Sequence, residues 1–159
     1  MGRNVRTLTM KMLNEFVIKG SPETRTAQQK GARIMGRRII FYEKPEVKKA
    51  KEELYFSMMP YVPDEPYEGP IYLRVLWLFD KKTMTKAENN SYKTSYPDLD
   101  NLAKGLLDVM TDLRFWNDDN EISKLELTKG WSKDYPGLFV QIWQLYPDED
   151  SILEWRGGV

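Results

Sequence analysis

The segment IYLRVLWLF, residues 71–79, constrains the fold of this 159-residue chain more than any other feature. Only Arg74 interrupts its run of apolar residues, and Pro70 and Asp80 mark its two ends. So short and so apolar a run is typical of a strand buried in the middle of a sheet. We therefore expect the chain to fold around a sheet that has this segment near its centre.

Segments on both sides of this strand have the periodicity of covering helices. Pro45 suits the first position of a helix, and apolar residues recur at helical spacing from there to Met58 and again from Leu99 to Leu113. The order of elements predicts an α+β domain, with helices packed on a single mixed β-sheet. The other expected strands are residues 15–19, 38–42, 122–131 and 138–146, of which the last two alternate in polarity and are expected to form a hairpin through the turn SKDYPG.

The length of the chain fits one domain covering residues 1–159. Two segments fall outside the pattern: residues 1–14 as an N-terminal extension, and residues 80–97 as a long polar loop of a kind that is often functional. No apolar run approaches the roughly 20 residues of a membrane span, and the N-terminus has no secretory signal. A cytoplasmic protein with no membrane partner is expected.

The chain contains neither cysteine nor histidine. This absence excludes disulfides, zinc–thiolate sites, Ser–His triads, histidine general bases and histidine metal ligands. Any catalysis must therefore use carboxylates, lysine, hydroxyl groups or a bound metal ion, and no nucleotide cofactor is expected.

Charge is distributed unevenly along the chain, although the formal net charge is zero. Residues 1–51 carry 13 Lys and Arg against 4 Asp and Glu, whereas residues 98–159 carry 6 against 13. A basic segment suits an anionic polymer, and an acidic segment suits bound cations. The alternative is that these charges lie on solvated faces and have no common role.

Two acidic groups frame the second expected helix. In YPDLDNLAKGLLDVM, Asp98 precedes the helix, Asp100 lies in its first turn, and Lys104 follows one turn later on the same flank. Asp118 and Asp119 precede the next strand. Each residue has an ordinary structural interpretation as a helix cap, a partner of the helix dipole, a surface ion pair or a turn residue.

The functional interpretation depends on these carboxylates acting together. Two carboxylates about 4 Å apart repel by roughly 4 kcal/mol in an effective dielectric near 20, so a cluster of them needs cations. Oxygen ligands without histidine or cysteine favour Mg²⁺ or Mn²⁺. An EF-hand calcium loop is a poor alternative, because NDDNE lacks the required spacing and glycine.

The segments YPDLDNLAKGLLDVM and FWNDDNEISKLELTK together resemble the RusA family of Holliday-junction resolvases. The shared signature is a D-x-D-N-x-x-K helix start, then an aromatic-containing D-D turn that leads into a strand. The specific match covers residues 96–129, and a weaker one reaches most of the chain. The resemblance implies a RusA-like homodimer that binds and cuts four-way junction DNA with Mg²⁺, or with Mn²⁺ as a substitute, in DNA recombination and repair. Such resolvases are commonly carried by prophages.

The resemblance also implies site residues. Asn101 and Asp118 also match the signature, and the resemblance implies that they support the site. The implied catalytic residues are Asp98, Asp100, Lys104 and Asp119, of which the three aspartates bind the metal. A helix from Leu99 to Leu113 would be about 22 Å long, and the six residues after it reach at most about 20–22 Å. Closure of the site within one chain, by a shortened or bent helix, is the preferred hypothesis, and completion across a dimer is the alternative.

Contacts to DNA phosphates are expected from the basic segment and the long polar loop. Two other functions remain open: a metal-dependent nuclease for other branched DNA, and a non-catalytic DNA-binding module in which the acids only cap helices. The predicted DNA contacts are Arg25, Lys30, Arg33, Arg37, Arg38, Lys81, Lys82 and Lys86.

Overall fold

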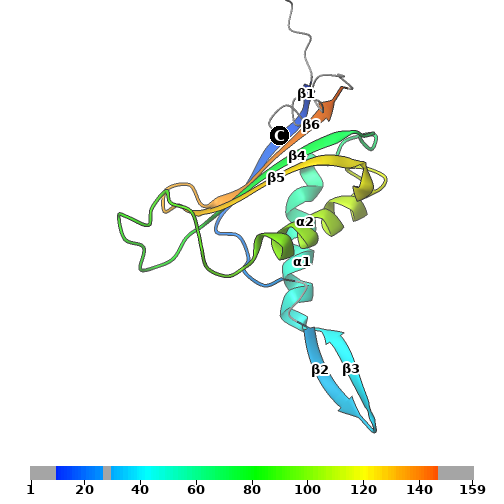
Figure 1. Ribbon diagram of the computed structural model, residues 1–159, viewed down its shortest axis with the longest axis vertical. Helices are drawn as coiled ribbons and strands as arrows, with labels where there is room; N and C mark the ends of the chain where they lie inside the picture. Colours follow the sequence, from blue (N-terminus) through cyan, green and yellow to red (C-terminus); the bar gives the residue numbers. More distant parts are fainter. Residues whose placement is uncertain (1–9, 27–29, 147–159) are drawn as a thin grey trace, which may run out of the picture.

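The computed structural model describes residues 10–26 and 30–146. Helices α1 and α2 cover one face of a four-stranded sheet with the strand order β1-β6-β4-β5, and a separate hairpin of β2 and β3 projects from this body (Figure 1). The elements are β1 (Met10–Lys19), β2 (Lys30–Met35), β3 (Arg38–Glu43), α1 (Pro45–Met58), η1 (Met59–Tyr61), β4 (Ile71–Phe79), α2 (Leu99–Asp112), η2 (Asp119–Glu121), β5 (Ile122–Trp131) and β6 (Gly137–Leu145).

Strand β4 lies inside the sheet, as its apolar sequence predicts. It pairs in parallel with β5 and antiparallel with β6. Alternate residues from Ile71 to Phe79 are buried in the core together with Leu106 and Met110 of α2. On the opposite face Arg74 is exposed and forms a 2.7 Å ion pair with Glu126 of β5. The sheet therefore has one packed face, towards the helices, and one more open face.

The predicted hairpin between residues 122–131 and 138–146 is wrong. β5 pairs with β4, whereas β6 pairs with β4 and β1, so β4 lies between the two strands. The chain passes from β4 through α2 to β5, a crossover that makes neighbouring strands parallel. The turn after β5 then carries the chain to the free edge of β4, where β6 buries its apolar residues on the core.

One strand boundary and one additional strand also differ from the sequence-based expectation. β1 begins at Met10, so residues 10–14 of the expected extension belong to the sheet, and residues 1–9 lie outside the described residues. The expected strand at residues 38–42 pairs with β2, in a polar stretch for which no strand was expected. The main sheet is single and mixed, as predicted, and the β2–β3 hairpin is a second, separate sheet.

The segment at residues 80–97 is a long loop without helix or strand, as predicted. It is nevertheless attached to the end of β5. The amide of Asn90 donates to the carbonyl of Trp131 at 2.8 Å, and the amide of Lys93 donates to that of Lys129 at 3.1 Å. No helix among the described residues is long and apolar enough to cross a membrane.

Candidate active site

The start of α2 presents three of the predicted site residues to solvent. Asp98 occupies the N-cap position, but its carboxylate makes no capping hydrogen bond. Asp100 in the first turn and Lys104 one turn later are both exposed, and no ion pair joins them among the described residues. The capping and ion-pair interpretations of these side chains therefore have no contact to support them, and both carboxylates are free to bind a ligand.

Two lysines hold the segment that leads into this helix. The ammonium group of Lys93 donates to the Ser95 hydroxyl at 2.6 Å and to the carbonyls of Ser95 and Tyr96. The ammonium group of Lys129, on β5, donates to the carbonyls of Ser95 at 2.8 Å and Pro97 at 2.7 Å. These bonds fix the backbone directly before Asp98, and so fix where α2 begins.

Lys93 is unusual because it is buried, with only 6% of its surface exposed. Its ammonium group lies 4.4 Å from the ring centroid of Trp131 and 5.4 Å from that of Phe79. Burial lowers the pKa of Lys93 below the usual lysine value, and the neighbouring charges of Lys129 and Lys81 lower it further. Aromatic faces and carbonyl oxygens surround this cation and compensate for its burial.

Sequence reasoning missed Lys93 and Lys129. Lys93 stands in a polar loop without periodicity, where nothing distinguishes it from Lys81, Lys82 or Lys86. Lys129 gives a weak signal, because it is in phase with Leu125 and Leu127, where the alternation of β5 predicts an apolar residue.

Asn101 and Arg25 line a cavity beside the start of α2. The cavity has a volume of about 350 Å³ and lies between residues 18–26, α1 and the first half of α2. The amide oxygen of Asn101 is buried and has no hydrogen-bond partner among the described residues. Arg25 forms a loose 3.8 Å ion pair with Glu23. The structure thus places the supporting residue Asn101 and the predicted DNA contact Arg25 at the same end of α2 as Asp98.

Asp118 and Asp119 lie at the opposite end of α2. The two residues line a groove together with Asp108 and Asp112 of that helix and with Glu52 of α1. The carboxylate of Asp118 accepts a 3.0 Å hydrogen bond from the amide of Asn120, which is an ordinary turn contact. Asp119 is exposed at the first position of η2. The interpretation as an ordinary turn residue therefore suits Asp118 better than Asp119.

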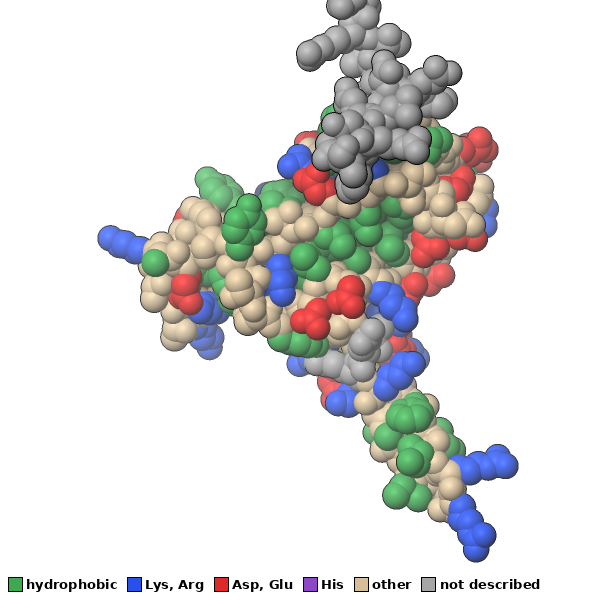
Figure 2. Space-filling view, viewed as in Figure 1, with side chains coloured by type: hydrophobic (Ala, Val, Ile, Leu, Met, Phe, Trp, Pro, Cys, Tyr) green, Lys and Arg blue, Asp and Glu red, His purple; other side chains and the backbone are tan. Residues whose placement is uncertain are grey.

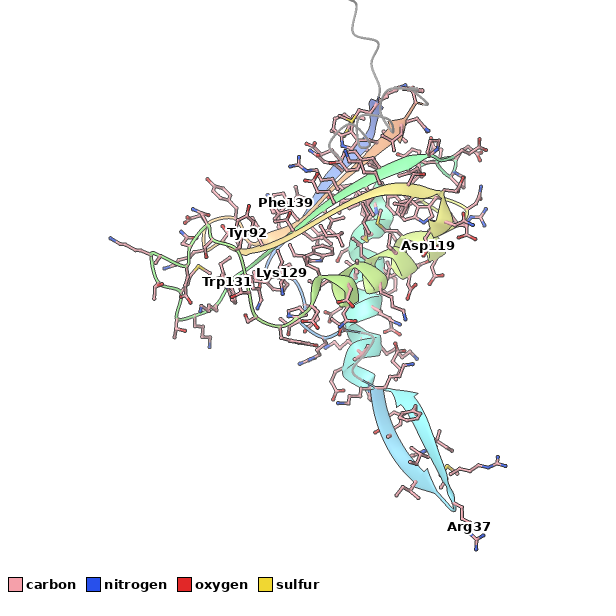
Figure 3. The ribbon with its side chains drawn as sticks, in the orientation of Figure 1. Arg37, Tyr92, Asp119, Lys129, Trp131 and Phe139 are labelled. Carbon is pink, nitrogen blue, oxygen red and sulfur yellow. The ribbon has the colours of Figure 1, made fainter. Side chains whose placement is uncertain are left out.

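The hypothesis that Asp119 returns to Asp98 within one chain is wrong. α2 contains 14 residues and is about 21 Å long, with Asp98 at its start and the groove of Asp119 at its end. Phe115 and Trp116 are fully buried and anchor the chain beneath the helix end, so the following residues do not run back along the helix. Lys129, which contacts the Asp98 end, and Asp119 lie at opposite ends of β5 (Figure 3).

The described residues of one chain contain no group of three or more acidic side chains that could hold a metal ion. The donor set at the start of α2 nevertheless suits Mg²⁺, which is usually held by one or two carboxylates and completes its shell with water and phosphate oxygens. Asp98 and Asp100 provide two such carboxylates, neither committed to an ion pair or a cap among the described residues. Binding of one ion by all three aspartates stays a prediction.

The predicted DNA-contacting cations lie on two projections and beside the cavity. Lys30, Arg33, Arg37 and Arg38 are on the β2–β3 hairpin. The loop at residues 80–97 carries the three lysines, of which Lys82 and Lys86 are exposed. Lys81 is committed to an ion pair with Glu88 and lies over the ring of Trp131. The start of α2 lies between the loop and the hairpin in Figure 1.

Comparison with known proteins identifies the family of this chain. Residues 18–143 match the family model described as endodeoxyribonuclease RusA. The chain is also 35% identical over 120 residues to the crossover junction endodeoxyribonuclease rusA of Lactococcus phage r1t, a match that covers 76% of this chain and 88% of that protein. The family match includes the α2 segment with its three predicted site residues and the turn that carries Asp119. The chain therefore belongs to the RusA family of endodeoxyribonucleases.

Proposed function

We propose that this protein is a Mg²⁺-dependent endonuclease that resolves four-way DNA junctions in recombination and repair, in the cytoplasm of its host cell. The observation that carries the proposal is the start of α2, where two carboxylates and a lysine are exposed on a backbone clamped by Lys93 and Lys129. Membership of the RusA family and the name of the phage relative support the substrate class.

The proposed site is completed by a second copy of the chain. Asp119 lies about one helix length from Asp98, so two α2 helices packed antiparallel about a two-fold axis would bring the start of each to the end of the other. The exposed flank of α2 suits this pairing, because Lys104 of one chain would lie opposite Asp108 of the other. Asp98 and Asp100 from one chain and Asp119 from the other would then form each of two identical sites.

The chemistry at each site is phosphodiester hydrolysis. Mg²⁺, or Mn²⁺ as a substitute, would be held by the aspartates and supplies a hydroxide at neutral pH together with polarisation of the phosphoryl oxygen. The ammonium group of Lys104 stabilises the negative charge that builds up on the phosphate in the transition state. Lys93 and Lys129 hold the backbone directly before Asp98 and so position its carboxylate.

A two-fold dimer also suits a two-fold substrate. Two sites related by the same axis would cut two strands of a junction symmetrically, and each cut would be made by equivalent residues. The cations of the hairpin and the loop would hold the DNA arms through phosphate contacts, which weaken steeply as salt increases.

The test is cleavage of a synthetic four-way junction by the full chain. Wild-type protein is expected to make paired, symmetric nicks with Mg²⁺ and none with EDTA. Asp100→Asn should lower the cleavage rate by at least about 100-fold while binding to the junction in Ca²⁺ changes little. Asp64→Asn, which alters an exposed acid between α1 and β4, is the matched control. Equal cutting in EDTA, or full activity of Asp100→Asn, would contradict the proposal, and preferential cutting of flaps or nicks would redirect it to another branched substrate.

A further inference from the structure

The β2–β3 hairpin has two chemically different faces. Cross-strand partners share a face, and the register pairs Ile34 with Ile39 and Ala32 with Phe41. These four residues form an apolar face, which is defined here as Ala32, Ile34, Ile39 and Phe41. Ile34, Ile39 and Phe41 are 79%, 65% and 69% exposed, so nothing in the described part of the chain covers this face.

The opposite face is mixed, with Arg33 and Arg38 among Met35, Ile40 and Tyr42, and the tip of the hairpin is basic. Register places Arg33 beside Ile40 and Arg38 beside Met35 on the second face, while Arg37 is in the turn with Gly36, whose φ is +63°. Hydrophobic side chains follow the length of the projection and basic side chains extend from its tip (Figure 2).

The hairpin also has very little negative charge. The four cations of residues 30–43 are accompanied by one carboxylate, Glu43. That carboxylate lies at the base of the hairpin and forms a 2.8 Å ion pair with Lys51 of α1. The projecting part is therefore positive without compensation.

A hairpin of this kind needs a partner. An isolated two-stranded ribbon is marginally stable in water. Large exposed apolar side chains at its centre mark a surface that contacts another molecule. Its strands of six residues are about 20 Å long, and a two-stranded ribbon is narrow enough to enter the major groove of DNA. The shape and the charge both suit a polyanion.

A second copy of the chain is the weaker occupant. A stable dimer interface usually buries about 800 Å² on each partner, far more than four side chains of one ribbon face provide. A nucleic acid that exposes base surfaces accounts for both faces of the hairpin at once.

We propose that the β2–β3 hairpin is an arm that inserts at the branch point of a DNA junction. Arg33, Arg37 and Arg38 bind phosphates of the adjoining arms, and the apolar face packs against base pairs that lose their stacking partners at the crossover. An intact duplex offers no such unstacked surface. The arm is therefore the element that distinguishes a branch from a duplex, an inference that rests on the proposed function only for its substrate class.

The test is binding without cleavage, with Ca²⁺ in place of Mg²⁺. The probe is a synthetic four-way junction with 2-aminopurine at the branch point, compared with a duplex of the same sequence. Wild-type protein should increase the fluorescence of the base as it unstacks. The double variant Ile34→Ser/Ile39→Ser should bind the junction about 10-fold more weakly, should bind the duplex as before and should lose the fluorescence change. Tyr135→Ser, at a site that is 72% exposed in the turn after β5, is the control and should behave as wild type.

A second double variant tests the phosphate contacts of the arginines at the tip of the hairpin. Arg37→Gln/Arg38→Gln should weaken binding to junction and duplex alike and should reduce the salt slope of log K by about 2, because two phosphate contacts are lost. Unchanged junction binding and fluorescence for Ile34→Ser/Ile39→Ser would overturn the inference. Dissociation of a dimer by that variant in sedimentation experiments would also overturn it, since the apolar face would then belong to a second copy. Failure of wild-type protein to cut junctions would count against the proposed function alone, because these measurements need no cleavage.

Discussion

The most informative single residue outside the predicted set is Lys93. A buried lysine is costly unless its charge is surrounded by acceptors, and here three oxygens of Ser95 and Tyr96 and the face of Trp131 do this. Its position two to three residues from the acceptors closes a tight loop directly before Asp98. The hydrogen bonds that compensate for burial of the Lys93 charge therefore also position Asp98, the predicted metal ligand.

Lys93→Met tests this link. The substitution keeps most of the length of the side chain but removes the donor, and the carbonyls left without it should lower the free energy of unfolding by about 1–3 kcal/mol. Because Asp98 is then less well positioned, the Mg²⁺ concentration for half-maximal junction cutting should rise several-fold at temperatures where the variant is folded. The measurement is a Mg²⁺ titration of cleavage alongside thermal unfolding.

Lys133→Met, at an exposed position in the turn after β5, is the control for this experiment. The ammonium group of Lys133 makes no hydrogen bond or ion pair among the described residues. A lower unfolding temperature for Lys93→Met with an unchanged Mg²⁺ midpoint would restrict Lys93 to a role in stability.

At the scale of elements, one carboxylate connects the residues of the first half of the loop at residues 80–97. Glu88 accepts hydrogen bonds from the ammonium group of Lys81 and from the amide and hydroxyl of Thr85. The hydrogen bond from Lys81 is the largest cause that lowers the pKa of Glu88 from 4.5 to about 2, and those from Thr85 add to it. The loop carries the predicted lysine contacts, so its order affects how they are presented to DNA.

This pKa predicts how the loop responds to acid. The folded pKa is lower than the unfolded one, so the stabilisation by Glu88 is complete above pH 4.5 and is lost as the pH falls towards about 2. The indole signal of Trp131, which lies 4.8 Å from the Lys81 ammonium, should report the change by NMR. Glu88→Gln should show the altered signal already at pH 7 and little change on acidification, with Glu65→Gln as the exposed control. A Trp131 signal at pH 7 that is the same in Glu88→Gln and wild type would contradict the prediction.

At the scale of the whole molecule, the α2 helix sets the distance between the two halves of the predicted site. Its start carries Asp98, Asp100 and Lys104, and its end lies in the groove of Asp119. In the proposed function an antiparallel partner helix brings these ends together, which makes dimerisation a requirement for activity.

Mixed dimers test this arrangement directly. Asp100→Asn and Asp119→Asn are each expected to be inactive as homodimers. When the two variants exchange subunits, about half of the dimers are mixed, and each mixed dimer has one intact site if the site is shared between chains. Cleavage should return to about a quarter of the wild-type level, as single rather than paired nicks. If each site were formed within one chain, every site would keep one substitution and mixing would restore nothing.

The sequence alone was sufficient for the local features of this protein. The strand β4 and the helix α2 were predicted because a strand in the middle of a sheet is apolar throughout, and a helix that buries one face shows a period of 3.6 residues. Asp100 and Lys104 were predicted to share one flank of α2 because residues four apart share a helix face, and both side chains are more exposed than the predicted position beside the core. Together with the resemblance of these segments, this identified the RusA family.

The tertiary structure decided what depends on distant partners. Whether β5 pairs with β6 or with β4 is set by the α2 crossover, not by the alternation within either strand. Asp119 stays at the far end of α2 because Phe115 and Trp116 bury their rings beneath it, a contact that no spacing rule contains. Lys93 and Lys129 meet at Ser95 from a loop and a strand 36 residues apart in the chain. Sequence patterns report which face a residue occupies, whereas packing across the whole core determines which residues meet.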